Sequence, residues 1–330
     1  MNLSKDAAAI RALLDSFSTD AFVQERMRDN VNGPAPTFDR EHFWYVLLGC
    51  LLTTQQRSTK GMPVPRFLAD EPFPLSLNAC RQNKDVEQFV LQTLTEYGGI
   101  RRASTVARQA MQNYKWLQNG GWSNIQALYE MLKQQRQRQP RDSDKASERR
   151  AAREADQELA GIGPKQSRNL WQWLGLTRYE IPLDSRVCAW VNDNLSFHID
   201  STKLGETAYY EQMLDCVQTV CAEAGVLPCL FDAAAFNDEN KVFSAKTEPQ
   251  LGERSQPRGT TAPGYVNQNG QVTIRDTGVK GTDHFQRVYQ IACSHCGHVY
   301  GANGSDIHER NCPKCQGGAE GLPLKVGHYA

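Results

Sequence analysis

The sequence predicts a mainly α-helical chain that ends in a small β-rich module. Apolar residues recur at helical spacing in many segments between residues 6 and 236. A polar stretch rich in Pro, Gly, Ser and Thr follows, and residues 264–330 contain a hairpin pattern and two closely spaced pairs of cysteines. We therefore expect an all-α core over residues 1–236, a linker over residues 237–263 and a separate module over residues 264–330.

Composition limits the classes of function that the chain can have. Its 330 residues include 37 Lys and Arg against 37 Asp and Glu, so the formal net charge is zero. Any nucleic-acid binding must then come from local patches and helix ends rather than from a global basic field. No apolar run approaches the length of a membrane span, and residues 1–17 lack a signal-peptide pattern. We therefore expect a cytoplasmic protein whose ten cysteines stay reduced.

Helical periodicity is clear before residue 140, where Gly and Pro divide it into segments. The expected helices cover residues 6–30, about 40–52, 85–97, about 103–114 and 123 to about 137. Breaks stand at residues 32–34, 98–99 and 119–121, and residues 60–80 are expected to form a Pro-containing loop region. Further on, helices are expected from residue 185 to near residue 198, over about residues 207–223 and within residues 225–236.

Residues 159–191 carry the pattern that is most informative about chemistry. The Gly161-Ile162-Gly163 turn precedes a helix expected to begin at Pro164, because Pro suits the first helical position. Bare backbone N–H groups and the positive end of the helix dipole make such a turn a site for an anion such as phosphate. Lys165 lies in the first turn of that helix, and Asp184 opens the next helix. A simpler interpretation is that Lys165 only binds phosphate and Asp184 only caps its helix.

The turn, the lysine and the aspartate together resemble the helix-hairpin-helix superfamily of DNA glycosylases (HhH-GPD). In that superfamily an L-x-G-[IV]-G-x-K turn is followed further along the chain by an aspartate in a V-D or L-D context. The matching residues here are Leu159, Gly161, Ile162, Gly163, Lys165, Leu183 and Asp184. The resemblance is to the lysine-bearing branch, which includes 8-oxoguanine glycosylase and endonuclease III, and it covers roughly residues 35–236.

The resemblance implies catalytic roles for two residues. Lys165 would attack the sugar carbon, displace the base and leave a Schiff base, which permits strand cleavage by elimination. Breaking the N-glycosidic bond builds positive charge on the sugar, which the carboxylate of Asp184 would stabilise. The base would first be flipped out of the duplex into a pocket between two helical subdomains.

The resemblance also implies contacts with DNA. Gly161 and Gly163 would hold a phosphate at the turn, and we expect Arg168 to contact DNA beside them. Many relatives carry an L-L-S-x-Q segment whose glutamine can fill the gap left by the extruded base. The residues at the corresponding place are Gln55, which matches the glutamine, with Gln56 and Arg57 beside it. A polar helix C-terminus explains Gln55 equally well.

Two features depart from the family pattern. Residues 134–154 are rich in Gln and Arg where relatives usually have a short loop, so we interpret them as an insertion. Such a charge run is typical of a solvated helical extension, which we favour over a segment that lies along a DNA backbone. Several relatives bind an iron–sulfur cluster just after the core, but Cys216, Cys221 and Cys229 have no fourth cysteine nearby. We therefore expect no iron–sulfur cluster.

The C-terminal module contains the second strong pattern. Residues 265–275 indicate a hairpin around Asn269-Gly270. Cys293-x2-Cys296 is followed, after fifteen intervening residues, by Cys312-x2-Cys315, which matches a four-cysteine zinc site of the ribbon type. Because all four ligands are protein thiolates, no position remains open for a substrate, and we expect one structural Zn²⁺ per chain. A disulfide interpretation is disfavoured in a reducing compartment.

The sequence therefore predicts a DNA glycosylase with a C-terminal zinc ribbon, whose partner is double-stranded DNA with a flipped base and not a membrane. Abasic-site (AP) lyase activity would accompany excision where Lys165 is the nucleophile. An oxidised purine such as 8-oxoguanine is the leading candidate for the excised base, because the lysine-bearing branch handles such lesions. Two alternatives stay open: removal of a hypermodified base from phage DNA in antiviral defence, and a non-catalytic DNA-binding module.

Overall fold

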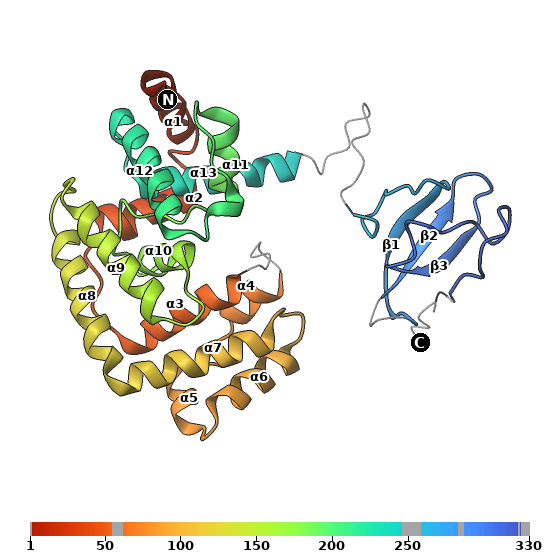
Figure 1. The fold of residues 1–330 in the computed structure, drawn as a ribbon, viewed down its shortest axis with the longest axis horizontal. Coiled ribbons are helices and arrows are strands. Elements are labelled where there is room, and N and C mark those ends of the chain that lie inside the picture. Colours follow the sequence, from red (N-terminus) through yellow and green to blue (C-terminus); the bar gives the residue numbers. More distant parts are fainter. Residues whose placement is uncertain (1, 55–61, 246–258, 283–286, 323, 325–330) are drawn as a thin grey trace. The chain divides into compact units, whose positions relative to one another are not determined.

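The structure is a computed structural model that describes residues 2–54, 62–245, 259–282, 287–322 and 324. These residues divide between two compact units, Met1–Glu248 and Pro249–Ala330. The first unit is helical, and the second is built around a small antiparallel sheet (Figure 1). The expected fold class, an all-α core followed by a small β-rich module, is confirmed. Gln55, Gln56 and Arg57 lie outside the described residues.

Helices make up the first unit, and several of them begin at caps that the sequence supplies. Its first half contains α1 (Leu3–Ser16), α2 (Ala21–Arg26), α3 (Arg40–Thr53), α4 (Pro63–Leu68), α5 (Leu77–Gln82), α6 (Val86–Tyr97) and α7 (Ala103–Trp116). Its second half contains α8 (Trp122–Arg136), α9 (Asp144–Glu158), α10 (Pro164–Trp173), α11 (Ser185–Asn194), α12 (Thr207–Ala224) and α13 (Pro228–Ala245). Short π- or 3₁₀-helical segments lie at Met27–Asn32, Leu117–Gly121 and Ser201–Lys203. Side chains of Asp20, Asp85 and Asp184 accept hydrogen bonds from the first turns of α2, α6 and α11.

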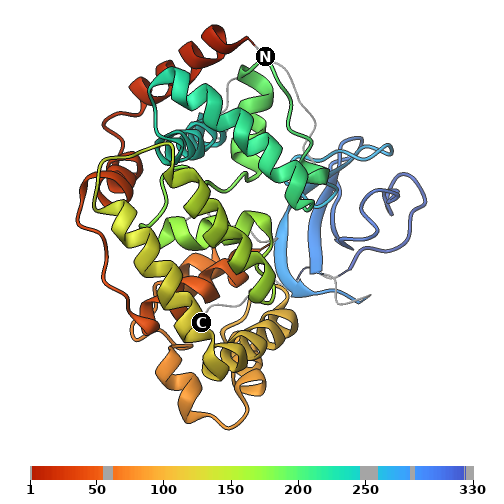
Figure 2. The same ribbon diagram turned by 60° about the vertical axis from the view of Figure 1, so that its left-hand side comes forward.

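Two apolar cores hold this unit together. One core is built by α3 to α10, and the other by α1, α2, α11, α12 and α13. The N-terminal helices α1 and α2, drawn in red, therefore pack beside α12 and α13 from the other end of the unit (Figures 1 and 2). Residues 174–184, called here the connecting segment, join α10 to α11. This segment contributes Leu174 and Leu176 to the first core and Ile181 and Leu183 to the second, so it crosses the point where the cores meet.

The helix pattern differs from the sequence prediction in four places. The helix expected to end near residue 198 is α11, which ends at Asn194. Residues 17–20 interrupt the helix expected over residues 6–30, and Asp20 starts α2 there. The loop region expected over residues 60–80 contains the short helices α4 and α5. At the end of the core, α13 continues to Ala245, past the residue at which we placed the start of the linker.

The segment interpreted as an insertion forms the end of α8, a turn and most of α9. We expected a solvated extension, and this expectation is wrong for one face of α9. Ala151, Ala152 and Ala155 are buried in the first core, and the indole N–H of Trp171 on α10 donates to the backbone oxygen of Ala151 at 2.9 Å. The pattern missed this packing because alanine adds little apolar character to a run of charged residues.

The second unit contains three antiparallel strands in the order β1 (Gln271–Lys280), β2 (Arg287–Cys293) and β3 (Val299–Asn303). The hairpin expected around Asn269-Gly270 is present, since Val266 pairs with Val272 and Gly270 has a left-handed φ of 73°. The apolar core of this unit is small and consists of Ile291, Tyr300, Ala302 and Ile307.

No single helix in the described part of the chain is long and apolar enough to cross a membrane. The pair formed by α12 and Pro228–Asn237 of α13 meets the requirement jointly, by length and composition only, but the two helices are bent by 98°.

Candidate active site and candidate metal centre

The glycine turn before α10 is held by buried side chains and by hydrogen bonds to α7, whereas Gly163 at the start of α10 is open to approach. Leu159 and Ile162 are buried, and the side-chain amide of Asn113 on α7 exchanges two hydrogen bonds with the backbone of Ala160 at 2.7 and 3.0 Å. Gly161 has a φ of 80°, a conformation that favours glycine, and a Cβ there would collide with the side-chain amide of Gln109. Gly163 caps α10, and among the residues that the structure describes no atom lies within 4 Å of the position its Cβ would take.

A surface depression of ≈ 620 Å³ lies at this turn, lined by Gln112 and residues 156–163. The depression reaches Gly161 and Gly163, the two residues that we expected to contact a phosphate. Asp156 and Glu158 also line it, so an anion at this turn would depend on backbone N–H groups and the helix dipole rather than on basic side chains.

Lys165 is half-buried in the first turn of α10. One residue later, Gln166 donates to the hydroxyl of Thr54 at 2.9 Å, and Asn169 donates to the sulfur of Cys50 at 3.8 Å. Burial raises the pKa of Cys50 to about 12, and Lys165 lies near enough to oppose this rise. The catalytic lysine expected from the sequence therefore lies beside the C-terminal turn of α3.

A second basic residue reaches the same turn. Arg102 precedes α7 with a left-handed φ of 61°, and its guanidinium donates to the backbone oxygen of Thr54 at 3.4 Å. Thr54 is the last described residue before Gln55. The start of α10, the turn before α7 and the end of α3 thus meet around Thr54, although they are far apart in the sequence.

Asp184 is the N-cap of α11. Its Oδ1 accepts from the backbone N–H groups of Arg186 and Val187 at 2.9 and 3.0 Å. Its Oδ2 receives two hydrogen bonds from the guanidinium of Arg186, at 2.9 and 3.1 Å. The carboxylate is half-buried. Oδ1 is committed to the helix cap, while Oδ2 is held by Arg186, whose guanidinium also lies 3.7 Å from the ring centroid of Phe236.

A buried carboxylate close to Asp184 was missed by the sequence analysis. Asp232 on α13 pairs with Arg26 of α2 at 3.7 Å, and both side chains are buried. Burial raises the pKa of Asp232 to about 6, Arg26 opposes the rise, and the negative charge of Asp184 adds to it. No sequence signal marks Asp232, because it lies in an apolar helix whose partners come from other parts of the chain.

Arg168, which we expected to contact DNA, is turned into the protein and is fully buried. Its guanidinium pairs with Glu180 at 3.0 Å, donates to the backbone oxygen of Pro164 at 3.1 Å and lies 4.7 Å from the ring centroid of Tyr210. A guanidinium that is enclosed and engaged in this way is not available to a phosphate. We therefore correct the expectation and assign Arg168 an internal role.

The connecting segment between the two candidate catalytic residues is held along its length. Glu148 of α9 is buried and accepts hydrogen bonds from the backbone N–H groups of Arg178, Tyr179 and Glu180 at 2.9, 2.7 and 2.9 Å. Burial raises the pKa of Glu148 to about 8, against these three hydrogen bonds. The segment that we interpreted as an insertion thus supplies an anchor for the path from α10 to Asp184.

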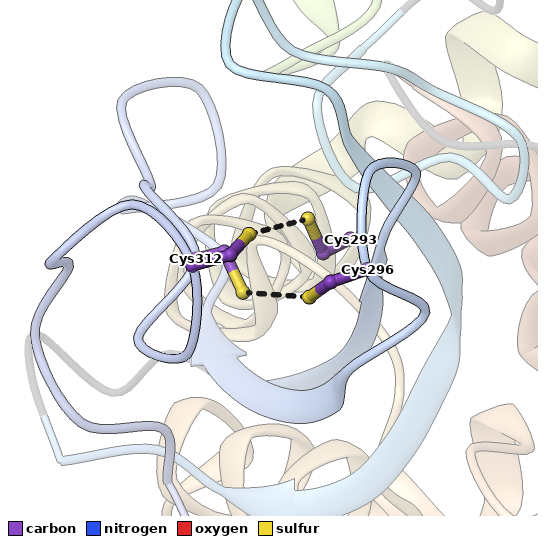
Figure 3. A group of neighbouring side chains, drawn as sticks. Cys293, Cys296 and Cys312 are labelled. Atoms are coloured by element: carbon purple, nitrogen blue, oxygen red, sulfur yellow. Dashed lines mark hydrogen bonds between the residues drawn. The ribbon is translucent and has the colours of Figure 1, made fainter.

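In the second unit, the four cysteines singled out in the sequence lie together. The sulfur atoms of Cys293, Cys296, Cys312 and Cys315 are all within 4.8 Å of one another (Figure 3). The Cys293–Cys315 and Cys296–Cys312 sulfur pairs are each 3.6 Å apart, far longer than the ~2.05 Å of a disulfide. Zn–S bonds of about 2.3 Å in a tetrahedron place sulfurs about 3.8 Å apart. The cluster therefore has the donor set and spacing of a tetrahedral metal site.

The fold of this chain is similar to two solved structures of 8-oxoguanine DNA glycosylases. One is from Methanocaldococcus jannaschii, with 13% identity and a TM-score of 0.48, covering 74% of this chain and 95% of that one. The other is from Thermotoga maritima, with 14% identity and a TM-score of 0.48, covering 75% of this chain and 100% of that one. No protein-family model and no curated protein matches the chain.

Proposed function

We propose that this protein is a DNA glycosylase that excises a modified base from double-stranded DNA, with Lys165 as nucleophile and Asp184 as the stabilising carboxylate. The placement of these two residues supports the proposal most. They begin the two helices that flank the connecting segment, which crosses the junction of the two apolar cores. A glycine turn with free space at Gly163 lies directly before the lysine.

DNA binding is proposed to start at the glycine turn. A phosphate oxygen can approach the backbone N–H groups at the start of α10, because no side chain in the described part of the chain lies within 4 Å of the Cβ position of Gly163. Such a contact fixes the position of the strand and does not read the base. The flipped base must then be recognised by other groups, since the reacting sugar carbon is inaccessible inside a stacked duplex.

The proposed chemistry uses the lysine and the carboxylate for different tasks. The lone pair on Nζ of Lys165 forms a bond to the sugar C1′, and the electron pair of the glycosidic bond leaves with the base. Ring opening of the resulting amino sugar gives a Schiff base, from which elimination cleaves the strand. Asp184 stabilises the positive charge that develops on the sugar as the bond to the base breaks.

The hydrogen bonds of Asp184 support assigning the electrostatic role to one of its two oxygen atoms. Oδ1 satisfies two backbone donors at the start of α11, and loss of those bonds would cost the helix its cap. Oδ2 is paired with the side chain of Arg186 and makes no contribution to the backbone cap. We assign Oδ2 the electrostatic role, with the cationic sugar taking the place that Arg186 occupies.

The four-cysteine cluster is proposed to hold one structural Zn²⁺. Zinc prefers four thiolates in a tetrahedral arrangement, and closed sites of this kind have no position for a substrate. The ion would fold the second unit rather than take part in excision. We propose that this unit contributes to DNA or partner binding.

A panel of duplexes tests the proposed activity and its substrate class. Each duplex carries one modified base, and excision is read as alkali-labile strand breaks. We expect an oxidised purine such as 8-oxoguanine to be excised, since the motif is that of the lysine-bearing branch. Excision of a hypermodified phage base alone would favour a defence role. Binding without any abasic-site formation across the panel would refute the enzymatic proposal and leave a DNA-binding module.

A further inference from the structure

The hydroxyl of Tyr210 forms two hydrogen bonds with the backbone immediately before Asp184. Tyr210 lies on α12 and is fully buried. Its Oη accepts from the backbone N–H of Leu183 at 2.6 Å and donates to the backbone oxygen of Ile181 at 3.0 Å. These two groups flank Pro182, which has no N–H of its own. One hydroxyl therefore fixes both sides of the proline that precedes the cap residue.

The hydroxyl can do this only while it keeps its proton. Burial raises the pKa of Tyr210 far above the physiological range, although the charge of Arg168 opposes the rise. The Oη atom is thus a donor and an acceptor at once, and both functions are used.

Arg168 links Tyr210 to α10, the helix that carries Lys165. Its guanidinium lies over the Tyr210 ring, with 4.7 Å from its central carbon to the ring centroid. The same group donates to the backbone oxygen of Pro164, the residue before Lys165, at 3.1 Å. It also pairs with Glu180 of the connecting segment at 3.0 Å. One side chain thus contacts the first turn of α10, the connecting segment and the tyrosine.

The side chains of this network are buried, and its charged groups are paired with one another. Arg168, Glu180 and Tyr210 are each 0% exposed. Glu180 also receives hydrogen bonds from Arg149 at 3.0 Å and from Gln218 at 3.1 Å. Buried polar networks whose members are satisfied rigidify the segments that they join, because any displacement leaves a group without a partner.

We propose that Tyr210 is a positioning residue for Asp184, and that Arg168 ties it to the helix that carries Lys165, so that the two catalytic groups keep a fixed relation. The proposal rests on the proposed glycosylase function. Tyr210 touches no substrate in this account, and it acts through the backbone of Leu183 on the cap that holds Asp184.

The test compares two tyrosines that are neighbours on α12. Tyr210→Phe removes the hydroxyl and keeps the ring against Arg168. The matched control is Tyr209→Phe, because the Oη of Tyr209 accepts from the backbone N–H of Asp200 at 2.8 Å, away from the connecting segment. Each variant of the full chain loses one tyrosine hydroxyl that is bonded to backbone.

Residue-resolved amide hydrogen exchange gives the readout that does not depend on activity. In Tyr210→Phe we expect exchange at Leu183, and at the capped amides of Arg186 and Val187, to rise on the order of tenfold. In Tyr209→Phe these three amides should exchange as in the wild type. Unchanged exchange at all three amides in Tyr210→Phe would overturn the proposal.

Single-turnover kinetics gives the second readout. We expect Tyr210→Phe to slow base excision roughly 10- to 100-fold, because a small misplacement of a catalytic group is costly, and to bind DNA within about twofold of the wild type. Tyr209→Phe should match the wild type in both quantities. Equal losses of binding and excision in Tyr210→Phe would show a merely structural role and contradict the proposal. Failure of the wild type to excise any base would refute the glycosylase function instead, while the exchange data would still decide whether Tyr210 fixes the cap.

Discussion

The two units of this protein are stabilised in different ways. The helical unit contains two large apolar cores and buried ion pairs such as Arg168–Glu180. In the described residues of the C-terminal unit, the apolar core is small and centres on Ile291, Tyr300, Ala302 and Ile307, beside the four-cysteine cluster. A unit with so little apolar burial is marginal without a further constraint. The comparison indicates that burial organises the first unit, whereas a metal ion would organise the second.

Removing a metal ligand should break the second unit alone. Cys312→Ser should lose most of the metal and unfold residues 259–322, because structural zinc contributes on the order of 10 kcal/mol to folding of small domains. Metal analysis should find about one zinc and no iron per wild-type chain. Limited proteolysis should then cleave the C-terminal unit of the variant and leave the helical unit intact. Cys216→Ser, which changes a cysteine of α12 outside the cluster, is the control. Full zinc occupancy in Cys312→Ser would contradict the assignment.

A cavity in the helical unit should lower the stability of that unit and leave the C-terminal unit unaffected. Trp171 is 0% exposed and Trp173, two residues later on α10, is 39% exposed. We expect Trp171→Ala to lower the free energy of unfolding by about 3–5 kcal/mol, and Trp173→Ala to lower it by no more than about 1 kcal/mol. Chemical denaturation followed by circular dichroism measures both values. Zinc content should stay unchanged, and loss of zinc in Trp171→Ala would show that the units do not fold separately.

The pH dependence of the two units should differ in sign. The folded-state pKa of Asp232, about 6, lies above the unfolded value of about 3.9. Its contribution therefore favours folding most below about pH 4 and is lost as pH rises through about 6, a change of roughly 2–3 kcal/mol. A thiolate metal site instead loses its metal as pH falls.

Asp232→Asn measures how much the carboxyl group of Asp232 contributes to the pH dependence of the unfolding free energy of the helical unit. The decline in unfolding free energy between about pH 4 and 6 should flatten in the variant. Asp193→Asn, which changes an exposed carboxylate on α11, should leave the decline unchanged. An identical pH profile in Asp232→Asn and the wild type would show that the buried group does not titrate as assigned.

The sequence predicts features that depend on short-range spacing. Pro164 and Asp184 begin helices where expected, because N1 proline and N-cap aspartate act within one turn. The four cysteines converge because each pair occupies one turn of the backbone. The helical spacing of apolar residues predicted the positions of α3, α6, α7 and α8 to within a few residues.

Features that depend on partners far away in the chain were not predicted. Arg168 follows Lys165 by three residues and was taken for a surface cation, but Glu180, Glu211 and Tyr210 enclose it from other elements. The burial of Asp232 depends on α2 and α11 in the same way. The spacing of Lys165 and Asp184 could be read from the sequence. The hydrogen bonds of Tyr210 to the segment between them could not.

Borohydride trapping tests the central claim most directly. On a duplex that the wild type excises, reduction should give a covalent protein–DNA adduct, because the Schiff base on Lys165 becomes a stable amine. Lys165→Gln should give no adduct while its DNA affinity stays within about twofold of the wild-type value. Asp184→Asn should keep the cap of α11, since Asn caps about as well as Asp, but should excise the base at least about 100-fold more slowly. An adduct in Lys165→Gln, continued base release by that variant, or full activity in Asp184→Asn would contradict the account.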